Sequence, residues 1–584
     1  MSSFSGFLPV VLGVLCLAAA SNGITVPIEG LGQVMGSETV TARTQQIVYQ
    51  FLNIPYAAPP VGERRFKAPV PISPWTGVKD VSMPGRACPQ LGVTTQNPEG
   101  NVSDLEDCLS VSVYTKNTTD NRPVMVFIHG GGFVTGAASI FEPDYLLEKD
   151  IVLVSIQYRL GPLGFLSTGT ANIPGNMAMY DIIAALEWVS SYIRFFGGDR
   201  TSVTIFGESA GAAAVSALLY SPTVRDDLFH RAIIQSGSVF APWATCKSPK
   251  EGALDIARRV NCDRPAESME DCLRSVSALR LMEAYEDHKN TQFNITGFPD
   301  VSGACIVIGE ASPFMPKHPK TLTRNAFRNV EIMAGTTSQE GLLFWEGVYK
   351  YGLSYKPENI QSSWELVQLI DTINERFGAG SNDGSHTWHQ LFGTFLTTEI
   401  HRANYTELLP GLVDICGNLA IKAPVLQDVT RFAHANPDKV YLYSFDYSGT
   451  PSIYNFSNQQ DFYYPYHNNS FHAEDLFYLF PLGYRLDQQD TEVAKTMVDL
   501  WTTFAMRGRP TASAVQKTWS PVAHFNGPYL KIGKQCEEFQ NYFNEFTAST
   551  DKARHQRSTA SLLHVSYLAA SLALMFSIVS SFIQ

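Results

Sequence analysis

Residues 202–215 read SVTIFGESAGAAAV, and this stretch decides the fold. An apolar run typical of a buried strand leads into Gly207-Glu208-Ser209-Ala210-Gly211, and a helix of small residues follows at once. In such a strand–turn–helix unit a strained turn holds the serine hydroxyl away from the backbone, and the flanking glycines give the chain room to turn. The G-x-S-x-G pattern also occurs by chance, but in this context it predicts a nucleophilic serine at Ser209.

Short, almost wholly apolar runs recur along the chain and are typical of strands buried on both faces of a parallel sheet. Helical segments lie between them; after Asn176, for example, Ile182, Leu186 and Val189 fall near 3.6-residue spacing. We therefore predict an α/β fold with a mostly parallel central sheet, helices on both faces and functional groups at the carboxyl ends of strands. The other runs are 124–130 (VMVFIHG), 151–158 (IVLVSIQY), 231–237 (RAIIQSG), 330–335 (VEIMAG) and 440–445 (VYLYSF).

A serine hydroxyl is a weak nucleophile, so it needs a base, an orienting carboxylate and donors for an oxyanion. The run 124–128 leads into HGGGF at 129–133, which predicts Gly131 and Gly132, together with Ala210, as backbone donors.

The chain order serine, acid, histidine indicates Glu340, in the loop TTSQEG, and His472, in FHAEDLFYLF. Glu474 and Asp475 are weaker candidates for the acid because they lie too close in sequence to His472.

The composition excludes several classes of protein. The chain has 584 residues, of which 55 are acidic and 43 basic, and the net charge of −12 argues against a nucleic-acid partner. Charged residues make up only 17% and hydrophobic residues 45%, which excludes intrinsic disorder and favours a large core. Without a repeat or a long linker, one large domain is expected over residues 24–547.

Both ends of the chain carry apolar segments. Residues 1–23 are expected to be a signal peptide, because a short apolar run is followed by small residues near Gly23. Residues 548–584 are interpreted as a GPI-attachment signal: the small residues Ala548, Ser549 and Thr550 precede a polar spacer and a final apolar run. A retained membrane anchor or a merely apolar tail remains the alternative. These features predict an extracellular protein held on the outer face of the plasma membrane.

The cysteines and sequons agree with export. The sequence has no C-x-x-C pair, which argues against a zinc site and favours disulfides in an oxidising compartment. No metal and no organic cofactor is expected. Glycosylation is expected at sequons on the surface. These are Asn101, Asn117, Asn294, Asn404, Asn455 and Asn468.

Several motifs together resemble those of the type-B carboxylesterases and cholinesterases, which have the α/β-hydrolase fold. They include NIPYAAPPVGERRF, EDCLSVSVY, IHGGGF, YRLGPLGFLS, FGESAGA, TTSQEG, FHAEDLFYLF and WTTFAMRGRP, and they extend along most of the chain. The resemblance implies Ser209 as nucleophile, Glu340 as acid and His472 as base.

The same resemblance implies disulfides Cys88–Cys108, Cys262–Cys272 and Cys416–Cys536. It leaves Cys246 and Cys305 either paired or as free thiols. It also places Trp243 in the acyl pocket, although a buried tryptophan is more often simply part of the core.

The loop between the first two cysteines bears on the substrate. In cholinesterases it carries a tryptophan that packs against a quaternary ammonium, but here residues 89–107 contain no aromatic side chain. We therefore expect a serine carboxylic ester hydrolase of the general carboxylesterase type, acting on small-molecule esters. A true cholinesterase and a non-catalytic, cholinesterase-like adhesion protein are the alternatives. The sequence predicts no oligomeric state.

Overall fold

The computed structural model describes residues 23–91, 105–246, 249–263, 268–296, 301–309, 312–323, 326–347, 405–452 and 470–552. Its centre is an eleven-stranded sheet in the order β16-β15-β14-β13-β10-β9-β7-β8-β6-β4-β3. The run from β15 to β8 is parallel, whereas β16 at one end and β6, β4 and β3 at the other pair antiparallel. The predicted mostly parallel sheet is therefore confirmed.

The strands of this sheet are β3 (Ser37–Val40), β4 (Ile47–Pro55), β6 (Ser110–Thr115), β7 (Arg122–Ile128), β8 (Val152–Ile156), β9 (Gly198–Glu208), β10 (Arg231–Gln235), β13 (Glu331–Thr337), β14 (Val440–Phe445), β15 (Tyr529–Ile532) and β16 (Cys536–Phe539). Two small sheets contain β1 (Thr25–Ile28), β2 (Gly32–Met35) and β5 (Val78–Asp80), and β11 (Thr245–Cys246) with β12 (Ile306–Val307). In the described part of the chain the α-helices are α1 (Gly161–Phe165), α2 (Met177–Tyr192), α3 (Ala210–Tyr220), α4 (Pro249–Arg259), α5 (Met269–Ser275), α6 (Ala278–Thr296), α7 (Leu342–Gly347), α10 (Tyr405–Gly417), α11 (Ala423–Ala435) and α12 (Gln488–Arg507).

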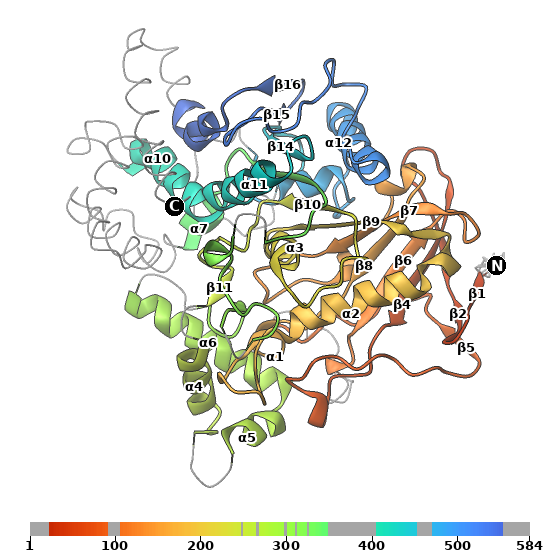
Figure 1. Cartoon of the computed structure of the whole chain (residues 1–584), viewed down its shortest axis with the longest axis vertical. Helices are drawn as coiled ribbons and strands as arrows, with labels where there is room; N and C mark the ends of the chain where they lie inside the picture. Colours follow the sequence, from red (N-terminus) through yellow and green to blue (C-terminus); the bar gives the residue numbers. More distant parts are fainter. Residues whose placement is uncertain are drawn as a thin grey trace, which may run out of the picture.

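Helices cover both faces of the sheet (Figure 1). Along β7, Val124, Val126 and Ile128 belong to one apolar cluster, which includes residues of α2 and α3. Met125 and Phe127 point to the other face and belong to a second cluster, which includes residues of α12. Because both faces of the strand are buried, its sequence reads as a continuous apolar run rather than an alternating one.

Close packing of β7 against α3 depends on a glycine. A Cβ atom added at Gly211 would lie only 1.9 Å from the carbonyl oxygen of Ile128. The helix that follows the turn at Ser209 can therefore approach the end of β7 only because residue 211 has no side chain.

Within the described residues there are three disulfides: Cys88–Cys108, Cys246–Cys305 and Cys262–Cys272. Disulfides are typical of the secretory pathway, in agreement with the expected export.

The prediction of a disulfide between Cys416 and Cys536 is wrong, because both residues are free thiols. Cys416 belongs to the apolar cluster on one face of the sheet, whereas Cys536 packs against the cluster on the other face. The two side chains therefore pack against different apolar clusters, and no disulfide joins them.

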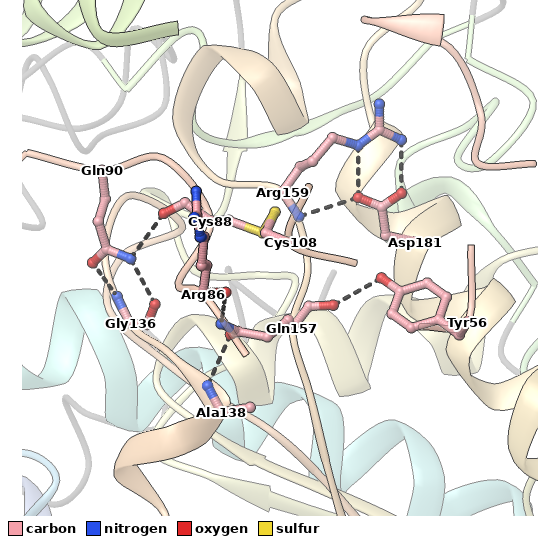
Figure 2. Close-up of a disulfide and its surroundings, with 10 residues drawn as sticks. All are labelled: Tyr56, Arg86, Cys88, Gln90, Cys108, Gly136, Ala138, Gln157, Arg159 and Asp181. Carbon is pink, nitrogen blue, oxygen red and sulfur yellow. Dashed lines mark hydrogen bonds and ion pairs between the residues drawn. A yellow bond between two sulfur atoms is a disulfide. The ribbon is translucent and has the colours of Figure 1, made fainter. Parts of the chain in front are cut away.

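A buried ion pair lies near the first disulfide (Figure 2). Arg159 donates to both carboxylate oxygens of Asp181 on α2, through Nε and Nη2, each at 2.7 Å. The two side chains are only 3% and 0% exposed. This bidentate geometry satisfies both oxygens of a carboxylate that burial would otherwise strongly disfavour.

One long apolar helical stretch belongs to the core. Among the described residues, Leu408–Ala435 is long and apolar enough to cross a membrane, with a mean hydropathy of 1.3. It nevertheless lies inside the fold, with 89% of its most apolar part buried. The chain then continues as folded structure past residue 547, through η13 (Tyr542–Thr547) and on to Lys552, the last described residue.

We predict that Asp181→Ala lowers the free energy of unfolding by about 3–5 kcal/mol, because it leaves the buried guanidinium of Arg159 without its counter-charge. Urea denaturation measures the change. The matched control is Asp227→Ala, which removes an equally bidentate partner of Arg225 at an exposed position. It should cost less than about 1 kcal/mol. Equal losses for the two variants would contradict the assigned role of burial.

We also predict that alkylation of the denatured, unreduced protein labels Cys416 and Cys536 and leaves the six bonded cysteines unlabelled. Peptide mapping by mass spectrometry reads the result. A cross-linked peptide that joins Cys416 to Cys536 would contradict the assignment.

Candidate active site

Ser209 occupies a strained turn between β9 and α3. Its φ and ψ are 56° and −122°, a combination that side-chain-bearing residues rarely adopt. The turn fits because its neighbours lack side chains: a Cβ at Gly237 would lie 2.1 Å from the carbonyl oxygen of Ser209. The N–H of Ser209 donates to the carbonyl of Gln235 at 2.9 Å. The serine as a whole is only partly buried.

Unpaired backbone donors lie beside this serine. A Cβ at Gly130 would be 3.1 Å from Cβ of Ser209, so the loop after β7 lies against the turn at Ser209. Gly131 and Gly132 are exposed and have positive φ values of 103° and 62°. Within the described chain, their N–H groups donate no hydrogen bond. Ala210 is the first residue of α3, where helical N–H groups have no intrahelical partner.

The segment after the glycine loop is held by two glutamine side chains (Figure 2). Gln90, next to the Cys88–Cys108 disulfide, accepts from the N–H of Gly136 at 2.9 Å and donates to its carbonyl at 2.8 Å. Gln157 accepts from the N–H of Ala138 at 2.8 Å. These contacts fix the segment that directly follows the glycine loop.

Glu340 and His472 are joined by a short hydrogen bond. Nδ1 of His472 lies 2.6 Å from Oε2 of Glu340, which is fully buried. The other oxygen, Oε1, accepts from the hydroxyl of Ser236 at 2.6 Å and from the N–H of Thr337 at 2.7 Å. Burial alone would raise the pKa of Glu340, but the charge of His472 and these hydrogen bonds outweigh it and lower the pKa. The carboxylate is therefore ionised and orients the ring.

The other ring nitrogen faces a second carboxyl group. Nε2 of His472 lies 3.1 Å from Oε1 of Glu208, without the geometry of a hydrogen bond. Within the described residues the ring makes no hydrogen bond with the hydroxyl of Ser209, although Glu208 and Ser209 are adjacent. Such contacts often form only when substrate is bound.

Burial and charge act in opposite directions on this pair. Burial lowers the pKa of His472, but the carboxylates of Glu208 and Glu340 outweigh it and raise the pKa to about 9. Burial raises the pKa of Glu208 to about 8, opposed by His472. The site therefore favours a positive charge on the imidazole.

The groups come together because they follow neighbouring parallel strands. The glycine loop follows β7, Ser209 follows β9, Ser236 follows β10, and Glu340 lies just beyond β13. The carboxyl ends of parallel strands meet at one edge of the sheet, where α/β proteins place their sites.

Two contact residues were not predicted from the sequence. Ser236 holds Glu340, and Glu208 faces His472. Ser236 could have been predicted as a site residue, because it directly follows a predicted strand that ends at the same edge of the sheet as β9 and β13. Glu208 lies inside the nucleophile motif but gave no sign of pointing toward the histidine.

Glu474 and Asp475, the two weaker candidates for the acid, accept hydrogen bonds from other groups. Glu474 accepts from the N–H of Phe471 at 2.9 Å, and Asp475 accepts from Gln235 Nε2 at 2.9 Å. Among the described contacts, neither of them bonds the ring of His472.

Trp243 is partly buried and lies near the glycine loop. Its indole N–H donates to the carbonyl of Ala420 at 2.9 Å, and its ring centroid is 6.5 Å from that of Phe133. Part of its surface is thus packed against the segment that follows Gly132.

Most of the predicted glycosylation sites lie outside the described residues or side chains: Asn101, Asn294, Asn404, Asn455 and Asn468. Asn117 is exposed in the connection between β6 and β7, as a glycan would require. Residues 92–104 of the loop without aromatic side chains are likewise outside the described part.

Sequence comparison identifies the family of the chain. A model of the carboxylesterase family matches residues 22–550. Esterase FE4 of Myzus persicae is 32% identical over 88% of this chain and 89% of its own length. Juvenile hormone esterase of Tribolium castaneum is 33% identical over 82% and 83%, and human carboxylesterase 3 is 30% identical over 94% and 96%. The chain belongs to the carboxylesterase family.

Proposed function

We propose that this protein is a serine carboxylic ester hydrolase in which Ser209 is the nucleophile, His472 the base and Glu340 the orienting acid. The hydrogen bond between Glu340 and His472, at the sheet edge that also carries Ser209, is the observation on which this proposal rests. The N–H groups of Gly131, Gly132 and Ala210 support it: they donate no hydrogen bond among the described residues, and acyl transfer needs donors for an oxyanion.

In the first half-reaction, Oγ of Ser209 bonds to the ester carbonyl carbon while its proton passes to Nε2 of His472. The backbone N–H groups bind the oxyanion that forms. The tetrahedral intermediate then breaks the bond to the alcohol oxygen, which takes the proton from His472 as it leaves. An acyl-enzyme on Ser209 remains.

In the second half-reaction, water adds to the acyl carbon and gives a proton to His472. The bond to Ser209 breaks, Oγ recovers the proton, and the carboxylic acid is released. Glu340 keeps the ring oriented and stabilises its positive charge at both stages, and no step requires a metal or an organic cofactor.

A general carboxylesterase is the preferred subclass, with Trp243 in the acyl pocket. The absence of aromatic residues from positions 89–107 argues against a cation–π site for choline, so a true cholinesterase is the weaker alternative. A purely adhesive role is disfavoured because nucleophile, acid and base are all present.

We also propose attachment to the outer cell surface through a GPI lipid, on the basis of the C-terminal sequence. Ala548, Ser549 and Thr550, the small residues in the sequence that precede the spacer, are only 8%, 1% and 5% exposed. This burial favours an attachment residue beyond Lys552, where processing would leave the domain intact.

The decisive experiment combines a phosphorylating serine reagent with an ester panel. We predict a stoichiometric adduct on Ser209 and hydrolysis of nitrophenyl and naphthyl esters in preference to choline esters. Ser209→Ala should lower kcat by at least about 10⁴-fold, since the remaining groups supply only binding and oxyanion stabilisation. An adduct on another residue would remove the assignment, and a preference for choline esters would overturn the subclass.

A second prediction concerns pH. The ring of His472 must be neutral to accept a proton, and the carboxylate of Glu208 raises its pKa. Glu208→Gln should therefore lower that pKa and move the acidic limb of the kcat/KM profile to lower pH by about one unit. The control is Glu492→Gln, which changes an exposed carboxylate on α12. An unchanged acidic limb in Glu208→Gln would show that the two groups are not coupled.

A further inference from the structure

A long helical stretch abuts the loop that carries Glu340. It consists of α10, the π-helical turn η10 (Asn418–Lys422) and α11. A Cβ at Gly341 would lie 1.7 Å from the carbonyl oxygen of Val413, and one at Gly417 would lie 3.3 Å from Cβ of Glu340. The backbones are therefore in direct contact at the acid. Single π-helical turns are rare and occur frequently at functional sites.

The π-helical turn ends with a lysine that is only 1% exposed. Nζ of Lys422 donates to the carbonyl of Ser338 at 2.8 Å and also to the carbonyl of Glu545. Ser338 lies two residues before Glu340, and Glu545 lies in η13 near the end of the described chain. One buried ammonium group thus links the C-terminal segment to residues 338–341, the loop that carries Glu340 and is here called the acid loop.

Lys422 donates to the carbonyl of Ser338, and the segment around Ser338 also contacts the loop that carries His472. The N–H of Gln339 donates to the carbonyl of Ser470 at 2.9 Å, and the N–H of Ser470 donates to the hydroxyl of Ser338 at 3.2 Å. Gln339 and Phe471 form a parallel bridge. A shift of Ser338 would therefore move both Glu340 and His472.

The C-terminal segment is fixed to the same region by further buried contacts. Asn418 donates to the carbonyl of Phe546 at 2.8 Å, and Asp414 accepts from the N–H groups of Ser549 and Thr550 at 3.0 and 2.8 Å. The side chain of Gln339 donates to the hydroxyl of Ser549 at 3.0 Å. Residues 545–550, here called the C-terminal latch, therefore pack directly behind the acid loop.

A buried lysine is costly, and an apolar side chain of similar length would fill the space at lower cost. Burial lowers the pKa of Lys422, while the negative charges of Asp414, Glu545 and Glu340 oppose this effect. The ammonium group thus has electrostatic as well as hydrogen-bonded contact with the acid region, which packing alone does not require.

We propose that Lys422 is a positioning residue for the Glu340–His472 pair, and that it acts by clamping the acid loop to the C-terminal latch. Hydrolysis then depends on a docked latch. This inference rests on the proposed hydrolase function.

The test is Lys422→Met, which keeps the length of the side chain and removes its donors. Active sites are counted by titration with the phosphorylating reagent, so that unfolded protein does not enter the rate. We expect kcat per titrated site to fall by about 10–100-fold, because small misplacements of reacting groups have effects of this size. KM should change by less than about threefold, since no substrate contact is removed.

Two further variants keep the result interpretable. Ser549→Ala removes the latch hydroxyl that contacts Gln339 and Asp414, and it should also lower kcat per site, by a smaller factor. Asp181→Ala loses stability at the Arg159 ion pair, and its kcat per site should stay at the wild-type value.

The possible outcomes are distinct. A wild-type kcat per site in Lys422→Met overturns the inference. If that variant does not fold, a wild-type kcat in Ser549→Ala overturns it instead. Failure of the wild-type protein to be labelled or to hydrolyse any ester would contradict the proposed function rather than the role of Lys422.

Discussion

The hydrogen bond between Glu340 and His472 is the contact on which the site depends. It joins side chains 132 residues apart, both of which are buried. Such a bond forms only if both loops are already held in register, because neither side chain can compensate for a displaced backbone. The surrounding structure meets this requirement through Ser236, Thr337 and the bridge between Gln339 and Phe471.

The electrostatic environment follows from the burial of several acids around one imidazole. Glu208 and Asp475 have pKa values raised by burial to about 8 and about 6, whereas hydrogen bonds and the charge of His472 keep the pKa of Glu340 low. Keeping such groups away from water destabilises the fold. In return, a positive charge on His472 is stabilised by a fixed environment that need not reorganise during reaction.

Much of the fold could be predicted because the relevant information is local. Strands such as β7 and β14 are buried on both faces and so read as unbroken apolar runs, and the turn at Ser209 carries its own glycines. Contacts between distant elements could not be predicted in this way. Lys422 and Ser236 act through partners more than eighty residues away, and nothing near them in sequence indicates those partners.

The error over Cys416 and Cys536 has a similar cause. The pairing was inferred from family resemblance, which does not specify on which face of the sheet each thiol lies. Cys246 and Cys305, which the sequence left open, are brought together by the short β11–β12 sheet, an element too small to give a sequence pattern.

The proposed oxyanion donors belong to the main chain, whereas the proposed nucleophile, base and acid are side chains. No exchange of one amino acid for another, apart from proline, removes an N–H group at Gly131, Gly132 or Ala210. A descendant of this protein that lost its chemistry through a single codon change at Ser209 or His472 would therefore keep an intact anion-binding cradle. Such a pseudoenzyme could still hold carboxylates or other small anions at the same place.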